Sequence, residues 1–234
     1  MARLREQGIA VQEGVLGRAC AAFHAPFSKL IRTGLPWVVF LYRTGRPDLR
    51  LPVAKAIFAL RRAAEAVVIG RRTAFGDPVL KDDWPAPVPS NRQLLRVVMD
   101  PGGDLAPSCR VWAPLDHQPV LRATLAMREP LPGVEDCWPA PGPGGFLLGS
   151  LLGELALRGV GRVLIEGGPN LARALLAQDL GDEFHSLDGD PASMPDALLA
   201  DPAFEHRRLP LPGGAWDTLR RRNWTGALSA ASST

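Results

Sequence analysis

The sequence predicts an α/β fold in which a mostly parallel sheet is covered by helices on both faces. Short, continuous apolar runs alternate along the chain with longer amphipathic segments. Apolar runs of this kind are typical of strands buried on both faces, as in parallel sheets. The intervening helices supply the crossover connections that parallel neighbours require. With 234 residues, of which 46% are hydrophobic, the chain can bury the core of such a fold.

Apolar runs bounded by turn signals define the predicted strands, and apolar residues at three- and four-residue steps define the predicted helices. The predicted strands are residues 8–15, 36–41, 66–70, 94–99, 119–126, 162–165 and 182–187. The predicted helices are residues 16–31, 51–64, 146–157 and 171–180. Pro26 is expected to interrupt or restart the first helix, because proline cannot donate a helix hydrogen bond. Residues 188–225 receive no assigned role.

Composition argues against several classes of partner. The net charge is +3, and the only run of one sign is Arg220–Arg222, whereas a nucleic-acid binder typically carries a basic face. No apolar run approaches the roughly 20 residues of a membrane span, and no apolar signal segment follows Met1, so we expect a cytoplasmic protein. The cysteines Cys20, Cys109 and Cys137 lack metal-ligand or redox-pair spacing, which predicts free thiols and no metal site.

The sharpest chemical feature is the segment Val163–Ala172, with the sequence VLIEGGPNLA. A buried strand delivers Glu166 and two glycines to its carboxyl end, where open α/β sheets bind ligands. Pro169 then begins a helix, whose first N–H groups can hold a phosphate. Alternatively, the glycines only make a tight connection and Glu166 only complements the helix dipole. The pattern is not the GxGxxG sequence of a Rossmann domain.

The histidines offer weaker candidates for chemistry. His24, His117, His185 and His206 are isolated from carboxylates and cysteines at ligand spacing, so structural or surface roles are favoured. His185 is the strongest exception, because it lies at a predicted strand near Asp182-Glu183. Tryptophans such as Trp216 are interpreted as packing residues.

Several segments, taken in order, resemble one known family. The stretch GVGRVLIEGGPNLARALLAQDLGDEF (159–184) resembles the hallmark of the riboflavin-biosynthesis deaminase–reductase (RibD) family. Residues 8–38, 60–80 and 96–100 resemble, respectively, its interdomain junction, its cofactor- and substrate-binding loop, and the next strand. The resemblance covers most of residues 8–187. It concerns the C-terminal reductase domain, because no H-x-E and P-C-x-x-C deaminase motif occurs.

The resemblance implies a dihydrofolate-reductase-like three-layer fold, NADPH as hydride donor and a homodimer. The implied activity is that of a 5-amino-6-(5-phosphoribosylamino)uracil reductase, acting on a phosphorylated pyrimidine. The positions that match the family's substrate contacts are Arg61, Leu80 and Glu166. Those that match its cofactor contacts are Thr73, Asp77, Gly167, Gly168, Pro169, Asn170, Leu171 and Ala172, with the turn holding the pyrophosphate. No catalytic residue is identified.

The sequence departs from the family on the substrate side. A lysine and a Ser-Leu-Asp-Gly turn that normally follow the first strand are absent, and Phe40 lies near the place of the lysine. Lys81 stands near an expected arginine, whose bidentate geometry it cannot reproduce. Two alternatives therefore stay open. The chain could be a non-catalytic paralogue that binds nucleotide or acts as a scaffold, or a reductase of another pteridine- or pyrimidine-like heterocycle.

The expected organisation is a single reductase-like domain with short flanking segments. Residues 1–33 are interpreted as a remnant of the interdomain linker and residues 34–226 as the domain. The Ala- and Ser-rich residues 227–234 are interpreted as a disordered tail.

Overall fold

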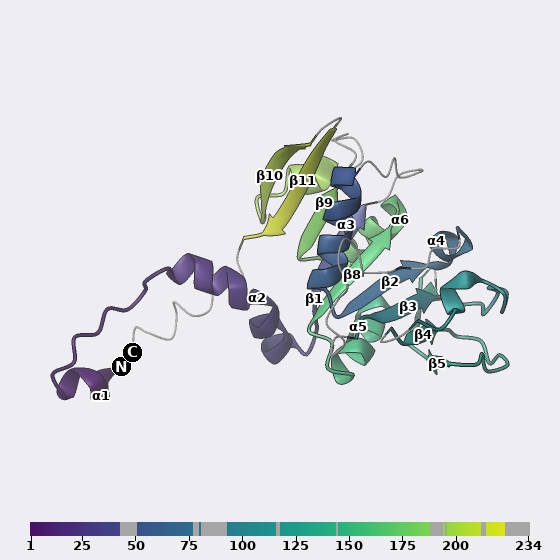
Figure 1. Cartoon of the computed structure of the whole chain (residues 1–234), viewed down its shortest axis with the longest axis horizontal. Coiled ribbons are helices and arrows are strands. Elements are labelled where there is room, and N and C mark those ends of the chain that lie inside the picture. The colour runs from purple at the N-terminus through teal and green to yellow at the C-terminus, as the bar shows by residue number, and fades with distance from the viewer. Residues whose placement is uncertain are drawn as a thin grey trace.

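The computed structural model describes residues 1–42, 51–76, 80, 93–115, 118–143, 145–187, 194, 196–211 and 214–222. Their centre is a nine-stranded sheet of order β10-β11-β9-β1-β8-β2-β3-β4-β5 (Figure 1). The strands are β1 (Trp37–Tyr42), β2 (Ala66–Gly70), β3 (Leu95–Met99), β4 (Val120–Ala123), β5 (Val134–Cys137), β8 (Arg162–Gly167), β9 (Glu183–Ser186), β10 (Phe204–Leu211) and β11 (Gly214–Arg221). A separate ribbon pairs β6 (Pro141–Gly142) with β7 (Gly145–Phe146).

The sheet is mixed and mostly parallel, as the sequence predicts. From β9 through β1, β8, β2, β3 and β4 to β5, every neighbouring pair is parallel. The exceptions are β11, which runs antiparallel to β9, and β10, which runs antiparallel to β11. Because the parallel strands share one direction, their carboxyl ends meet at one edge of the sheet, where ligands bind in open α/β folds.

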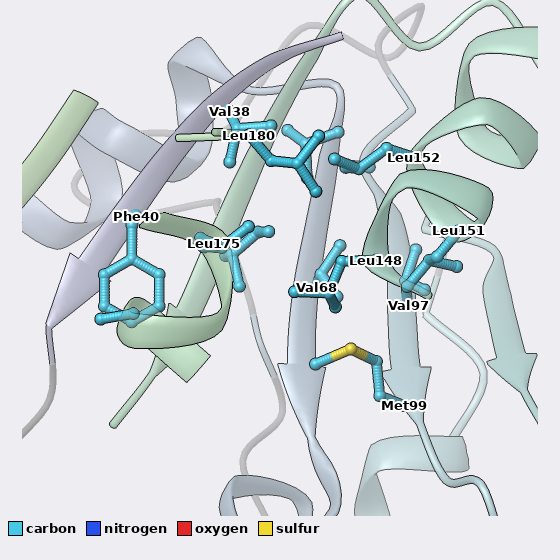
Figure 2. Packing of buried hydrophobic residues seen from close by; sticks show 14 of the residues in the cluster. Val38, Phe40, Val68, Val97, Met99, Leu148, Leu151, Leu152, Leu175 and Leu180 are labelled. Carbon is cyan, nitrogen blue, oxygen red and sulfur yellow. The ribbon is translucent and has the colours of Figure 1, made fainter. Parts of the chain in front are cut away.

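Helices cover both faces of the sheet, which confirms the predicted three-layer class. The helices are α1 (Ala2–Glu6), α2 (Gly17–Thr33), α3 (Leu51–Ala63), α4 (Arg71–Phe75), α5 (Leu148–Leu157), α6 (Pro169–Ala177) and α7 (Asp196–Leu199), with a 3₁₀ turn at Arg110–Trp112. One core cluster joins the sheet to α5, α6 and α7, and Figure 2 shows Leu148 and Leu175 facing Val68 and Phe40 within it. The second cluster joins the opposite face to α2, α3 and α4.

Two local predictions near the N-terminus are wrong. Residues 8–15 form turns and coil between α1 and α2 instead of a strand. Pro26 lies inside a continuous α2 instead of interrupting it. Proline leaves the carbonyl of Ala22 without its helix partner, and the guanidinium of Arg220, on β11, donates to that carbonyl at 2.8 Å. This long-range bond satisfies the acceptor that the proline leaves open.

A buried ion pair fastens α2 to the sheet. The Lys29 ammonium donates to the Asp182 carboxylate at 2.5 Å, and the two side chains are 5% and 1% exposed. The same carboxylate oxygen accepts the backbone N–H of Val38 at 2.7 Å. Burial raises the pKa of Asp182 and lowers that of Lys29, because desolvation disfavours the charged form of each group. The attraction between the two charges opposes both shifts. The C-terminal half of α2 thus packs on the sheet, whereas α1 and the start of α2 project away from it (Figure 1).

The domain boundary at residue 34 stays a prediction, and residues 227–234 lie outside the described residues.

Candidate active site

Two neighbouring strands end in the segments to which the sequence assigns cofactor binding. Strand β2 leads into α4, which carries the half-buried Thr73, and β8 leads through Gly167 and Gly168 into α6. The strands are adjacent and parallel, with Ile69 paired to Glu166. Thr73 and the glycine turn therefore lie at the same edge of the sheet. Asp77 lies outside the described residues.

Gly168 is the N-cap of α6 and faces open space. Its backbone is extended, with φ −97° and ψ −174°, so its conformation does not require glycine. A Cβ atom added there would meet no described residue within 4 Å. No side chain caps α6, and Pro169, which has no N–H, begins the helix, so the N–H of Asn170 is the early helix donor that an anion can accept from.

Gly167 has a different role from Gly168. A Cβ atom there would come within 2.9 Å of the Leu171 side chain and 3.4 Å of the Phe40 ring. Contacts this short force neighbouring side chains to move, so Gly167 permits the close packing of α6 against the sheet.

The remaining predicted cofactor residues of α6 divide by position. Asn170 is exposed, and its side-chain oxygen accepts a hydrogen bond from Arg173 at 2.8 Å. Leu171 and Ala172 pack against the core, and their N–H groups donate to the carbonyl of Gly168, each at 3.2 Å. The turn thus presents Gly168, Pro169 and Asn170 outward, but not the side chains of Leu171 and Ala172.

The predicted substrate residues Arg61 and Glu166 bond directly to each other. Arg61 Nε donates to Glu166 Oε1 at 2.6 Å, and a terminal guanidinium nitrogen donates to Oε2 at 3.0 Å. Their side chains are 8% and 0% exposed. Glu166 points to the face covered by α3, since Val163 and Ile165 of the same strand point to the opposite core. This pair fixes a charged, oriented group beside the glycine turn.

Leu80 lies in the apolar cluster on the same face as Glu166. It is 2% exposed and has a φ of 50°. The left-handed backbone conformation is unfavourable for a bulky side chain. Residues in this conformation persist where the surrounding structure enforces it, which is common at binding sites.

Phe40 is a core residue and does not replace the missing family lysine at the site. Its ring packs against Tyr42 and Phe184, each with centroids 5.9 Å away, on the face opposite Glu166. The residue of β1 level with Glu166 is Leu41. Residues 43–50, which include the departure from the Ser-Leu-Asp-Gly turn, and Lys81 lie outside the described residues.

His185 is a further buried polar residue at this sheet edge. Its Nδ1 accepts a hydrogen bond from the indole N–H of Trp216 at 2.9 Å and lies 3.2 Å from Thr218 Oγ1. Its Nε2 is buried and has no hydrogen-bond partner within the described part of the chain. The sequence separates His185 from Trp216 by 31 positions, so only strand pairing reveals the contact.

Acidification is expected to weaken the fold through His185. Burial lowers the pKa of this imidazole from 6.5 to about 4; Glu183 opposes the shift, and Arg162 and Arg220 add to it. The unfolded chain therefore takes up the proton at higher pH than the folded chain. The stabilisation is complete above about pH 6.5 and is lost as the pH falls through 4, by about 3 kcal/mol.

Urea unfolding near neutral pH and near pH 4 tests this expectation. Wild type should lose about 2–3 kcal/mol more on acidification than a His185→Phe variant, which lacks the titrating group. Equal losses would contradict a buried, neutral imidazole.

Among the described residues, no group of three or more His, Cys, Asp and Glu side chains could hold a metal ion. No helix within the same residues is long and apolar enough to cross a membrane. Cys20, Cys109 and Cys137 are free thiols, as expected, and burial raises the pKa of Cys137 to about 11.

Comparisons with known proteins bear on the same segments. The sequence model of the RibD C-terminal domain matches residues 44–187. The riboflavin biosynthesis proteins RibD of Chlamydia muridarum and Chlamydia trachomatis are 32% and 30% identical over 236 aligned positions, which include 89% of this chain. The chain spans 63% and 62% of the length of these relatives.

Solved structures share the fold. A Thermotoga maritima diaminohydroxyphosphoribosylaminopyrimidine deaminase/5-amino-6-(5-phosphoribosylamino)uracil reductase superposes with a TM-score of 0.73 at 21% identity, covering 94% of this chain and 66% of that one. For Acinetobacter baumannii RibD the TM-score is 0.69 at 22% identity, covering 94% and 67%. For the Saccharomyces riboflavin biosynthesis reductase Rib7 it is 0.59 at 13% identity, covering 87% and 99%. The family match includes Arg61, the glycine turn and the strand that carries Glu166, and the chain belongs to the RibD C-terminal domain family.

Proposed function

We propose that the chain is an NADPH-dependent reductase of a phosphorylated ribosylaminopyrimidine, such as 5-amino-6-(5-phosphoribosylamino)uracil. The observation that carries the proposal is the open space in front of Gly168, at the uncapped start of α6 and one strand from Thr73. A pyrophosphate fits such a turn, because the N–H of Asn170 lies at the helix start and no described side chain obstructs its approach. The names of the similar proteins support the same class of reaction.

The residues of this chain would bind and orient both reactants. Thr73, Gly168 and Asn170 would hold NADPH, which supplies the hydride when bound. Glu166, oriented by Arg61, would accept hydrogen bonds from the pyrimidine, because each carboxylate oxygen can accept a second bond. Leu41 and Leu80 would provide the apolar surface beside it. Acceleration would come mainly from positioning the two reactants in a shielded site.

Replacing Gly168 by alanine is expected to weaken NADPH binding without unfolding the protein. The added methyl group has space in the free chain but occupies the approach to the helix N–H groups. NADPH should raise the melting temperature of wild type, and the variant should need at least about tenfold more NADPH for the same shift, a loss of about 1.4 kcal/mol.

Gly153→Ala is the matched control, because a Cβ at this position of α5 also meets none of the described residues within 4 Å. It should keep the wild-type shift. An unchanged shift in Gly168→Ala would contradict the pyrophosphate assignment.

A non-catalytic, nucleotide-binding or scaffolding member of the family is the second candidate. It is favoured by Phe40, a core residue near the place of the family lysine. NADPH oxidation in the presence of the pyrimidine separates the two candidates, because only the reductase consumes NADPH. Reduction of another heterocycle is the outcome to pursue if NADPH binds and this pyrimidine is not turned over. The homodimer and the cytoplasmic location remain predictions.

A further inference from the structure

His185, Leu41 and Glu166 form one row across three adjacent strands. Leu41 of β1 is paired with Glu166 of β8 on one side and with His185 of β9 on the other. Side chains at paired positions of neighbouring strands point to the same face. The row lies towards the carboxyl ends of the strands. Its polar ends, Glu166 and His185, are two strand spacings apart, or about 9.6 Å. A polar group thus stands on each side of an apolar centre.

The hydrogen bonds of His185 fix which ring nitrogen carries the proton. The indole N–H of Trp216 can only donate, so Nδ1 must be the acceptor of the 2.9 Å bond. The neutral ring then carries its proton on Nε2. This N–H is buried, and no described residue accepts it. A buried donor without an acceptor is costly, so the arrangement calls for an acceptor that this part of the chain does not provide.

The surroundings indicate what kind of acceptor fits. The row supplies one neutral N–H beside Leu41 and the ring of Trp216, whose centroid lies 5.8 Å from that of His185. A phosphate dianion prefers several donors and positive charge, but the two cations that act on His185, Arg162 and Arg220, are both paired with Glu183. A carbonyl oxygen on a flat heterocycle matches the one neutral donor. At the far end of the row, the Glu166 carboxylate suits the amino groups of such a ring.

We propose that the Nε2–H of His185 donates a hydrogen bond to a ring carbonyl of the pyrimidine, and so orients it against Glu166. The inference rests on the proposed function and adds to it a residue that determines specificity. His185 is a positioning residue here, held by Trp216, and it transfers no proton. Because Nε2 is shielded in the free chain, the pyrimidine must displace the groups that cover it.

Binding of 5-amino-6-(5-phosphoribosylamino)uracil to the whole chain, measured by calorimetry with NADP⁺ present so that no hydride can be transferred, tests the inference. His185→Phe should weaken pyrimidine binding at least about tenfold, the loss of one neutral hydrogen bond. His185→Gln, which keeps an N–H donor, should stay within about threefold of wild type. His24→Phe, at an exposed position of α2, is the matched control and should bind as wild type. NADPH binding should be the same in all four proteins.

A spectroscopic measurement covers the case in which His185→Phe does not fold. In wild type with ¹⁵N-labelled histidine, the ring spectrum should show a protonated Nε2 and an unprotonated Nδ1 for His185. The Nε2–H proton should move downfield when the pyrimidine is added. A protonated Nδ1, or an Nε2–H signal that does not respond to bound pyrimidine, would overturn the inference.

The outcomes separate this inference from the proposed function. Equal pyrimidine binding by wild type and His185→Phe refutes the role of His185 and leaves the reductase intact. If wild type binds NADPH but not the pyrimidine, the role of His185 is also refuted, and only the NADPH-binding part of the proposed function remains. If wild type binds neither compound, the proposed function fails and the inference fails with it.

Discussion

Replacing Arg61 by methionine is expected to lower the free energy of unfolding by about 3–5 kcal/mol, the usual cost of breaking a buried ion pair. The variant removes the guanidinium that bonds both oxygens of the Glu166 carboxylate, whose side chain is 0% exposed. A carboxylate in this position is stable as an anion only with a charged partner. Urea unfolding near neutral pH measures the loss.

Two further variants make the test specific. Arg62→Met, at the exposed neighbouring position of α3, should change stability by less than about 1 kcal/mol. Adding Glu166→Gln to Arg61→Met should recover part of the loss, because the amide carries no charge. A cost below about 1 kcal/mol for Arg61→Met would contradict the buried pair and, with it, the orientation of Glu166 on which substrate binding depends.

Replacing Asp182 by alanine is the second substitution with a large expected effect, again about 3–5 kcal/mol. The carboxylate bonds both the Lys29 ammonium and the Val38 N–H, so its removal takes the charged partner from a buried ammonium and one acceptor from a buried N–H. Asp182 also joins β1 to β11 through its backbone, which donates to Val38 and accepts from Arg221. We expect α2 to lose its attachment and become protease-sensitive, because Lys29 is its buried anchor.

Asp179→Asn is the matched control for Asp182. Asp179 bonds Arg221 at 2.6 Å, but its side chain is 81% exposed, and its left-handed backbone, with φ 54°, suits asparagine. This control should change stability by less than about 1 kcal/mol. If Asp182→Ala and Asp179→Asn lowered the free energy of unfolding by similar amounts, the expected effect of burial on the Lys29–Asp182 pair would be contradicted.

Local patterns in the sequence were sufficient to predict the central strands and most helices. Strand β2 was predicted with its observed bounds, and the unit from β8 to α6 was predicted with ends that differ by at most three residues. These elements depend on continuous apolar runs, glycines and Pro169, which act within a few residues. Strands β10 and β11 were not predicted, because β10 is an exposed edge strand whose polar residues lack an apolar run.

The contacts within the candidate site were decided by the tertiary structure. The resemblance placed Arg61 and Glu166 near substrate, but their mutual bond joins residues 105 positions apart. The same holds for His185 and Trp216, and for Arg220, which satisfies the carbonyl that Pro26 leaves open. Strand register decides which residues share a face, and a shift of one residue would reverse it. The sequence by itself therefore determined the central elements and the glycine turn. The packing of the sheet determined that Glu166 and His185 flank Leu41, because long-range partners are set only once the strands are paired.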